Sequence, residues 1–129
     1  MDTNHITVVY KWTAHPGKLD ELAAIYRDVT AAMEHNEPGA EAVHLYVSDS
    51  ENAVYIRDEF VDAEAMGFHL GTTAAVHFPA LLAIATPGPF FFLGDVPAEM
   101  QDHTAQMQLG GEFALHAAGF DRDADQVPA

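Results

Sequence analysis

Cysteine is missing from the 129-residue chain, and basic residues are scarce. The lack of cysteine excludes disulfide bonds, thiolate nucleophiles and cysteine-ligated zinc sites. Only five lysines and arginines stand against twenty aspartates and glutamates, which gives a formal net charge of −15. Because this charge repels phosphate backbones and anionic lipid surfaces, we do not expect nucleic acid as a partner.

The sequence also lacks segments that would direct the chain to a membrane. No run approaches the roughly 18 apolar residues of a transmembrane helix, and the first six residues have neither the basic nor the apolar region of a signal peptide. We therefore expect a soluble, cytoplasmic protein with no membrane partner.

Motifs that bind metals or nucleotides are missing as well. The eight histidines form no His-x-x-x-His or His-Glu-x-x-His pair, and the acidic residues form no EF-hand-like run. No Gly-x-Gly-x-x-Gly sequence follows a strand-like segment. We therefore predict neither a metal site nor a cofactor.

The chain has enough apolar sequence for one compact core. Apolar residues make up 49% of the sequence, and no repeat or linker divides it. We predict a single domain over residues 1–129, with its core at about 5–95, an extension at about 96–120 and a frayed tail at 121–129.

Hydrophobic periodicity predicts the order of the elements. Alternating β-branched and aromatic residues indicate strands, and apolar residues three or four positions apart indicate helices. The predicted strands cover 5–12, 42–47, 53–60 and 90–93, and the predicted helical regions cover 18–35 and 63–84. A short helix between 97 and 108 and a candidate fifth strand at 112–116 follow. This order predicts an α+β, ferredoxin-like βαββαβ fold with a C-terminal helix and strand extension.

Turn and cap residues refine the second half of this prediction. Asp62 is a plausible N-cap for the second helical region. Proline favours the first turn of a helix, so Pro79 predicts a fresh helix and a break near residues 71–78. The Thr86-Pro87-Gly88-Pro89 sequence predicts a loop before the last core strand.

Alternation also assigns the two faces of the predicted strands. The helix side receives the consistently apolar sets: Ile6, Val8, Tyr10 and Trp12; Val43, Leu45 and Val47; and Val54, Ile56 and Phe60. The opposite face of the second and third strands is mixed, and we assign it to a partner subunit or a cleft; it carries His44, Tyr46, Tyr55, Arg57 and Glu59.

Several short motifs, taken in order, resemble a known family. They are Pro-Gly-Lys-Leu-Asp-Glu-Leu at 16–22, Glu-Pro-Gly at 37–39, Asp-Glu-Phe-Val-Asp-Ala-Glu-Ala-Met at 58–66, and His69 followed by His77-Phe78. Over roughly residues 5–95 the chain resembles the antibiotic-biosynthesis monooxygenase superfamily. That resemblance implies a homodimer in which two sheets pack into a dimeric α+β barrel. It also implies one of several activities, among them cofactor-independent oxygenation of quinol-type substrates.

The residues themselves suggest roles within such a site. A histidine titrates near neutral pH, so His69 or His77 is a candidate base for a phenolic proton, whose removal prepares the substrate for reaction with dioxygen. Arg57 is a candidate for stabilising an anion. Candidate substrate-binding residues are Trp12, Tyr10, Phe78, His44 and Tyr46.

Three functional hypotheses remain open at this point. The first is an oxygenase for a polyphenol or hydroquinone, with that small aromatic molecule and dioxygen as its partners. The second is a non-catalytic ligand-binding or dimerisation module, in which the histidines and aromatic residues are ordinary packing residues and Arg57 pairs with an acid. The third is a haem-handling protein; Asn4 and Trp12 fit it, but the second helical region carries no tryptophan.

Overall fold

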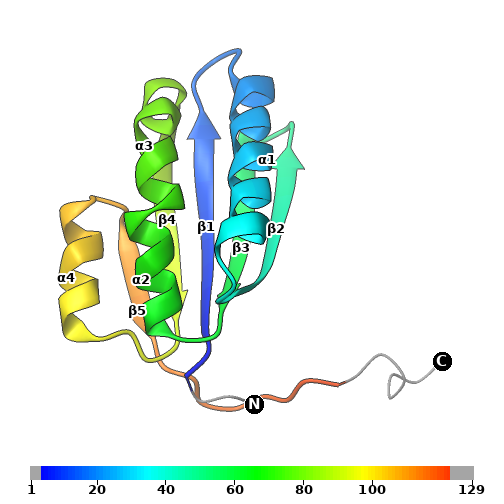
Figure 1. Ribbon diagram of the computed structural model, residues 1–129. Helices are drawn as coiled ribbons and strands as arrows, with labels where there is room; N and C mark the ends of the chain where they lie inside the picture. The colour runs from blue at the N-terminus through cyan, green and yellow to red at the C-terminus, as the bar shows by residue number, and fades with distance from the viewer. Residues whose placement is uncertain (1–3, 123–129) are drawn as a thin grey trace.

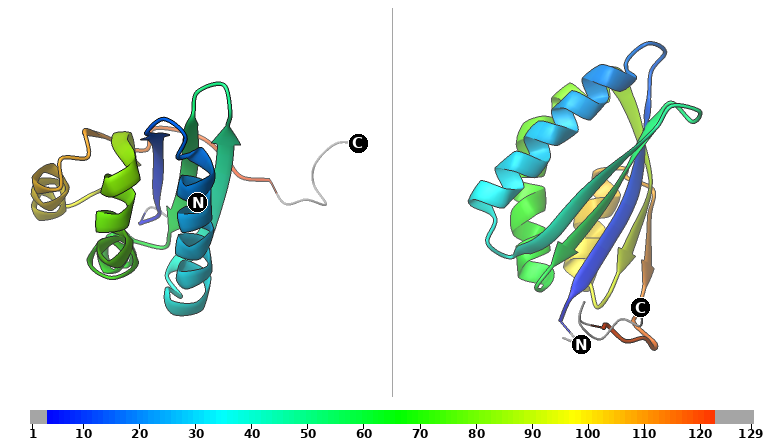
Figure 2. Two further views of the ribbon diagram at one scale, coloured as in Figure 1. Left: turned by 90° about the horizontal axis from the view of Figure 1, so that it is seen from above. Right: turned by 90° about the vertical axis from the view of Figure 1, so that its right-hand side faces the viewer.

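The computed structural model describes residues 4–122, which form five strands and four helices in two layers (Figure 1). The strands make one sheet in the order β2-β3-β1-β4-β5. All the helices lie on one side of it, which leaves the other face of the sheet open (Figure 2). The elements are β1 Ile6–Ala14, α1 Leu19–Asn36, β2 Ala40–Ser48, β3 Ala53–Phe60, α2 Ala63–Gly71, α3 Thr73–Ile84, β4 Ala85–Leu93, α4 Ala98–Gln106 and β5 Gly111–Ala114. The predicted α+β, ferredoxin-like fold with a C-terminal extension is confirmed.

β1 is the central strand, and it shows the predicted alternation. Ile6, Val8, Tyr10 and Trp12 are each at most 5% exposed, whereas the residues between them lie half-buried on the open face. Because successive side chains of a strand point to opposite faces, burial of this apolar set places Tyr10 and Trp12 beneath the helices. The two rings therefore border the space between the two layers.

α1 packs one apolar face on the sheet. Its buried residues Leu22, Tyr26, Val29 and Met33 recur at intervals of three or four, which keeps them on one side of the helix. The helix ends at Asn36 because the residue before Pro38 disfavours helical dihedral angles. That ending places Glu37 in the turn between α1 and β2.

The β2–β3 hairpin separates its two faces as expected. Val54, Ile56 and Phe60 are buried against the helices, and Val43 and Leu45 pack on the same core. Val47 lies near the end of the strand and is 47% exposed. The mixed face turns toward the open side of the sheet.

The second helical region is broken inside the predicted interval. Asp62 caps α2, since its Oδ1 atom accepts a hydrogen bond of 2.8 Å from the Ala65 backbone N–H. The break falls at Thr72, whose hydroxyl donates to the Phe68 carbonyl at 2.6 Å, and the two helices meet at a bend of 52°. The placement of Pro79 in the first turn was wrong, because it lies inside α3. Pro79 has no backbone N–H and so removes one hydrogen bond of the helix, but burial of Leu81 and Ile84 stabilises the turn that follows it.

The C-terminal part differs from the prediction in two places. β4 begins at Ala85, so the residues predicted as a loop, 86–89, belong to the strand. Pairing with β1 is irregular there, with a register shift between Tyr10 and Trp12, and such an irregularity accommodates prolines that cannot donate to the ladder. β5 runs parallel to β4 over Gly111–Ala114, shorter than the predicted 112–116. Most of the predicted tail, residues 123–129, lies outside the described residues.

Helix length and composition decide whether a helix could span a membrane. Between residues 4 and 122, no single helix is long and apolar enough to cross a membrane. α2 and α3 reach that length and composition only as a pair, across their bend.

Candidate functional site

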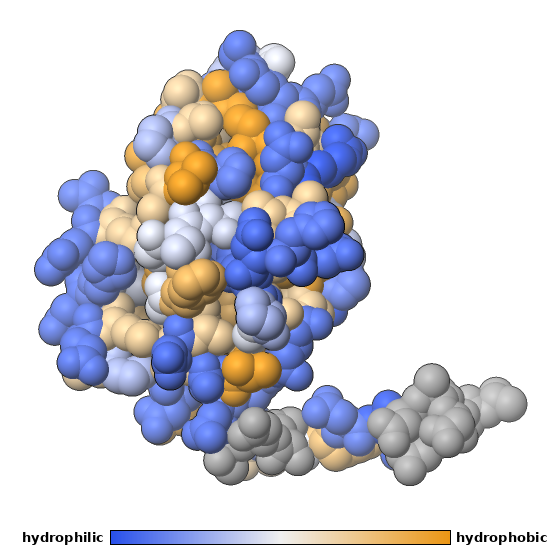
Figure 3. Space-filling model, in the orientation of Figure 1, coloured by the Kyte–Doolittle hydropathy of each residue, from blue (hydrophilic) through white to orange (hydrophobic). Residues whose placement is uncertain are grey.

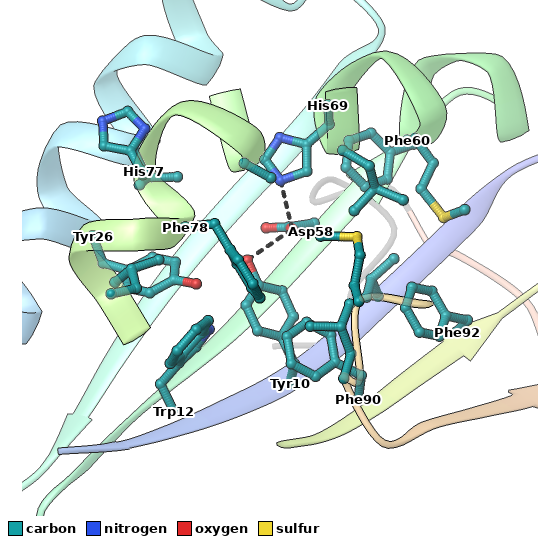
Figure 4. A pocket seen from close by; sticks show the side chains of 18 residues that line it. Tyr10, Trp12, Tyr26, Asp58, Phe60, His69, His77, Phe78, Phe90 and Phe92 are labelled. Atoms are coloured by element: carbon teal, nitrogen blue, oxygen red, sulfur yellow. Dashed lines mark hydrogen bonds and ion pairs between the residues drawn. The ribbon is translucent and has the colours of Figure 1, made fainter. Parts of the chain in front are cut away.

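A cavity of about 40 Å³ lies between the sheet and the helices (Figure 4). Aromatic rings, here called the aromatic wall, make up a large part of its lining: Tyr10, Trp12, Tyr26, Phe60, Phe78, Phe90 and Phe92. Tyr10 stacks on Phe90 with ring centroids 4.5 Å apart, and Phe78 meets Trp12 edge-on at 5.7 Å. This volume accommodates about one or two water-sized molecules, far less than the roughly 300 Å³ of a typical small-molecule site.

Asp58 brings a carboxylate into this apolar space. It lies on the buried face of β3, between Ile56 and Phe60, and is 2% exposed. The Tyr10 hydroxyl donates to its Oδ2 atom at 3.1 Å, whereas Oδ1 has no hydrogen-bond partner among the described residues. Burial raises the pKa of Asp58 to about 6, although the charge of His69 and the Tyr10 hydrogen bond oppose the rise. Asp58 therefore changes charge near neutral pH.

His69, on α2, stands between two buried carboxylates. Its Nδ1 atom lies 3.0 Å from Oε2 of Glu37, and its Nε2 atom lies 4.0 Å from Oδ2 of Asp58. The first distance is a hydrogen bond and the second is only an ion-pair separation. Burial acts to raise the pKa of Glu37, but the hydrogen bond and charge of His69 outweigh it and leave that pKa below its usual value. An ionised Glu37 fixes His69 Nδ1 as a hydrogen-bond donor.

Glu37, His69, Asp58 and Tyr10 thus form a continuous chain, here called the polar cluster, from the α1–β2 turn to the cavity. Figure 4 shows its inner end, with the Asp58 carboxyl between His69 and Tyr10. Burial, together with the nearby charge of Asp58, raises the pKa values of Tyr10 and Tyr26, so both hydroxyls keep their protons. Asp58 can accept a proton inside an otherwise apolar site, beside the hydrogen-bonded pair of Glu37 and His69.

Five of the predicted site residues meet at this cavity. Tyr10 and Trp12 come from β1, His69 from α2, and His77 and Phe78 from α3. The Nδ1–H of His77 donates to the Thr73 carbonyl at 2.9 Å within its own helix. His77 therefore borders the cavity apart from the polar cluster (Figure 4).

The other three predicted site residues, Arg57, His44 and Tyr46, lie apart from this cavity in the single chain. Arg57 is one residue from Asp58 on β3, and strand alternation turns it to the open face. There it pairs with Glu59 at 2.9 Å and stands opposite His44 of β2. This ion pair with Glu59 is the role that the non-catalytic hypothesis gives to Arg57.

Comparison with known proteins places this architecture in a family. The family model for antibiotic biosynthesis monooxygenases matches residues 5–80. The chain belongs to this family. That match spans β1 through most of α3 and so includes the polar cluster and the aromatic wall except Phe90 and Phe92. No curated protein matches the sequence significantly.

Solved structures of similar shape support the family's fold for this monooxygenase-family chain. MupZ from Pseudomonas fluorescens matches with a TM-score of 0.71 and 20% identity, over 98% of this chain and 99% of its own. SnoaB from Streptomyces nogalater, a cofactor-independent oxygenase, matches with a TM-score of 0.61 and 22% identity, over 74% of this chain and 96% of its own. A conserved protein from Methanosarcina mazei matches with a TM-score of 0.62 and 16% identity, over 73% and 95%. The likeness to MupZ therefore extends through the C-terminal helix and strand.

The sequence-based reasoning missed Asp58 and Glu37, the two carboxylates of the polar cluster. Asp58 is the single acid on a face of β3 that is otherwise apolar, and that interruption of the alternation was a readable signal. Glu37 stands in the Asn-Glu-Pro-Gly sequence, which indicates a turn but carries no sign that its carboxylate is buried. Only the packing of α2 over this turn reveals its contact with His69.

Proposed function

We propose that the protein is a cofactor-independent monooxygenase that acts on a small, electron-rich aromatic molecule such as a polyphenol or hydroquinone. One observation carries this proposal: the polar cluster opens into a cavity walled by aromatic rings. Such rings hold a flat ligand by stacking, and a buried acid–base group removes its phenolic proton. Membership of the family and the likeness to a cofactor-independent oxygenase support the assignment.

The reaction balances without an external reductant. A hydroquinone that loses its phenolic proton becomes an electron-rich anion, which passes an electron to dioxygen. One oxygen atom then enters the ring carbon and the other leaves as water, so that hydroquinone and dioxygen give hydroxyquinone and water. The substrate supplies all the electrons, and the protein supplies position and proton transfer.

A ring needs more room than this cavity offers, and we propose that a movement of the helical roof provides that room. Phe78 fills the space against Trp12, and the break at Thr72 separates the two helices that hold His69 and Phe78. Apolar side chains lie on the outer surface of the same helices (Figure 3), with Phe68 51%, Val76 74% and Leu82 45% exposed. A tilt of α3 about the break would move Phe78 off Trp12.

We further propose that the active protein is a homodimer formed through the open face of the sheet. That face carries Val9, Phe91 and Leu93 on β1 and β4, and Tyr46, which is 54% exposed, on the edge strand β2. A second copy facing it would cover these apolar groups, as in the dimeric α+β barrel implied by the family resemblance.

Oxygen consumption tests the proposed function directly. Hydroquinone and related polyphenols are added to the purified protein in an oxygen-electrode cell, and the products are identified by mass spectrometry. We expect oxygen uptake above the autoxidation rate and a product that has gained one oxygen and lost two hydrogens. Uptake at the autoxidation rate with every phenol would refute the proposal.

The small cavity itself favours a second candidate, a non-catalytic ligand-binding or dimerisation module. If the protein's own side chains permanently keep the cavity at about 40 Å³, no aromatic substrate can reach Asp58. A dimer that neither binds nor oxidises any phenol would favour the dimerisation module, and binding without oxidation would favour the ligand-binding module.

A further inference from the structure

One oxygen of the polar cluster has no hydrogen-bond partner among residues 4–122. Oδ2 of Asp58 accepts from Tyr10 and faces His69, whereas Oδ1 accepts no hydrogen bond. Asp58 is 2% exposed, so water in bulk does not compensate this atom. Buried acceptors are nearly always paired, and a charged one gains most from a donor. Since Asp58 lines the cavity, a ligand in that space is positioned to provide the donor.

The charges around the cavity restrict what that ligand can be. Glu37 and Asp58 bring two carboxylates, and His69 between them offers one imidazole. Within the described part of the chain, no lysine or arginine lines the cavity. An anionic group on the ligand would meet the Asp58 carboxylate with no lysine or arginine to balance it, since His69 already faces two carboxylates, and its desolvation would be poorly compensated.

We infer that Oδ1 of Asp58 is the ligand-binding atom of the cavity and selects neutral aromatic molecules that carry a hydroxyl group over anionic ones. This inference rests on the proposed function and names its catalytic group. In that reaction Oδ1 takes the phenolic proton: the O–H bond breaks, its electron pair stays on the phenol oxygen, and Asp58 becomes a carboxylic acid. His69 and Tyr10 hold the other oxygen of Asp58, and Glu37 is a positioning residue that acts through His69.

Trp12 provides a way to observe binding without turnover. It is the single tryptophan of the chain, it lines the cavity, and its indole N–H has no hydrogen-bond partner among the described residues. Its indole signal in a proton–nitrogen correlation spectrum should therefore shift when a ligand enters. Titrations under argon exclude the reaction with dioxygen.

Three ligands of related shape separate the contributions. Hydroquinone carries two hydroxyl donors, para-xylene replaces them with methyl groups of similar size, and gentisate adds a carboxylate to hydroquinone. We expect hydroquinone to bind the wild-type protein and gentisate to bind at least about tenfold more weakly. In Asp58→Asn, hydroquinone should lose about tenfold in affinity, para-xylene should be unchanged, and gentisate should improve. The matched control Asp49→Asn, in the exposed β2–β3 turn, should behave as wild type.

Three results would overturn the inference. They are equal losses of hydroquinone and para-xylene affinity in Asp58→Asn, gentisate binding as tight as that of hydroquinone in the wild-type protein, and a Trp12 signal that no ligand moves. The wild-type comparison needs no variant, so it remains a test if Asp58→Asn fails to fold. The titrations are run without oxygen, so they test binding separately from the reaction. If they show the expected selectivity but the electrode assay shows no oxygen uptake, only the oxygenase proposal is refuted. Oxygen uptake without this selectivity would refute only the role of Asp58.

Discussion

Replacing Asp58 with asparagine should remove a pH dependence of stability that runs opposite to that of an ordinary carboxylate. Burial raises the pKa of Asp58 from 3.8 to about 6, so the folded protein binds this proton more tightly than the unfolded chain does. The contribution of Asp58 to stability is therefore greatest below about pH 4, falls as the pH rises to about 6, and then stays constant. One pKa unit equals about 1.4 kcal/mol, so the full loss is about 3 kcal/mol.

The comparison between the two proteins isolates this effect. Asparagine stays neutral at every pH, and its side-chain oxygen can still accept the hydrogen bond of Tyr10. Burying the new amide N–H groups costs free energy, but that cost does not depend on pH and cancels between two pH values. We expect Asp58→Asn to gain about 2 kcal/mol relative to the wild-type protein between pH 4 and pH 8, because part of the full difference is already lost at pH 4.

Urea unfolding followed by far-ultraviolet circular dichroism measures this difference. Wild type, Asp58→Asn and the exposed control Asp49→Asn are unfolded at steps between pH 4 and pH 8. The control should keep a constant offset from wild type. A constant offset for Asp58→Asn as well would show that folding does not desolvate the carboxyl group, and would refute the reasoning built on its burial.

Four other substitutions should have distinct outcomes. In the oxygen-electrode assay, His69→Ala should reduce kcat at least about a hundredfold because it breaks the polar cluster, whereas His77→Ala should cost less than about tenfold; equal losses would contradict this order. Val9→Asp, on the open sheet face, should convert the proposed dimer to monomer in light-scattering chromatography, and an unchanged mass would place the interface elsewhere. Asp62→Ala removes the α2 cap and should lower the free energy of urea unfolding by about 1 kcal/mol; no change would show that another group satisfies the helix end.

Much of the fold was predictable because local patterns and tertiary packing agree. In β1 the alternation continues over the whole strand, and burial follows it residue by residue. They disagree around Pro79 and in residues 86–89. There proline and glycine signal a helix start and a loop, but burial of Leu81 and Ile84 and pairing with β1 keep the backbone regular. Local propensity is a weak prior, and tertiary contacts overrode it at both places.

The site was only partly predictable, for a geometric reason. Aromatic residues and histidines could be chosen by type, and five of them do meet at one cavity. The faces of β3 decide the rest: Arg57 points to the open side and Asp58 to the cavity, although they are adjacent in sequence. Glu37 and His69 are far apart in the chain, and their contact exists only because α2 crosses over the α1–β2 turn. Spacing in a sequence cannot reveal such a contact.

The polar cluster is a local conflict within a fold that is otherwise consistent. Three buried polar atoms lack hydrogen-bond partners among the described residues: Nε1 of Trp12, Oε1 of Glu37 and Oδ1 of Asp58. Each destabilises the folded protein, and an apolar residue at position 58 would complete the apolar face of β3. Where a protein keeps such a conflict beside a cavity, its chemistry is the first explanation to test. The unfolding experiment measures how much ionised Asp58 lowers the free energy of unfolding without a ligand. The titrations measure how much affinity its Oδ1 atom contributes when it accepts a hydrogen bond from a ligand hydroxyl group.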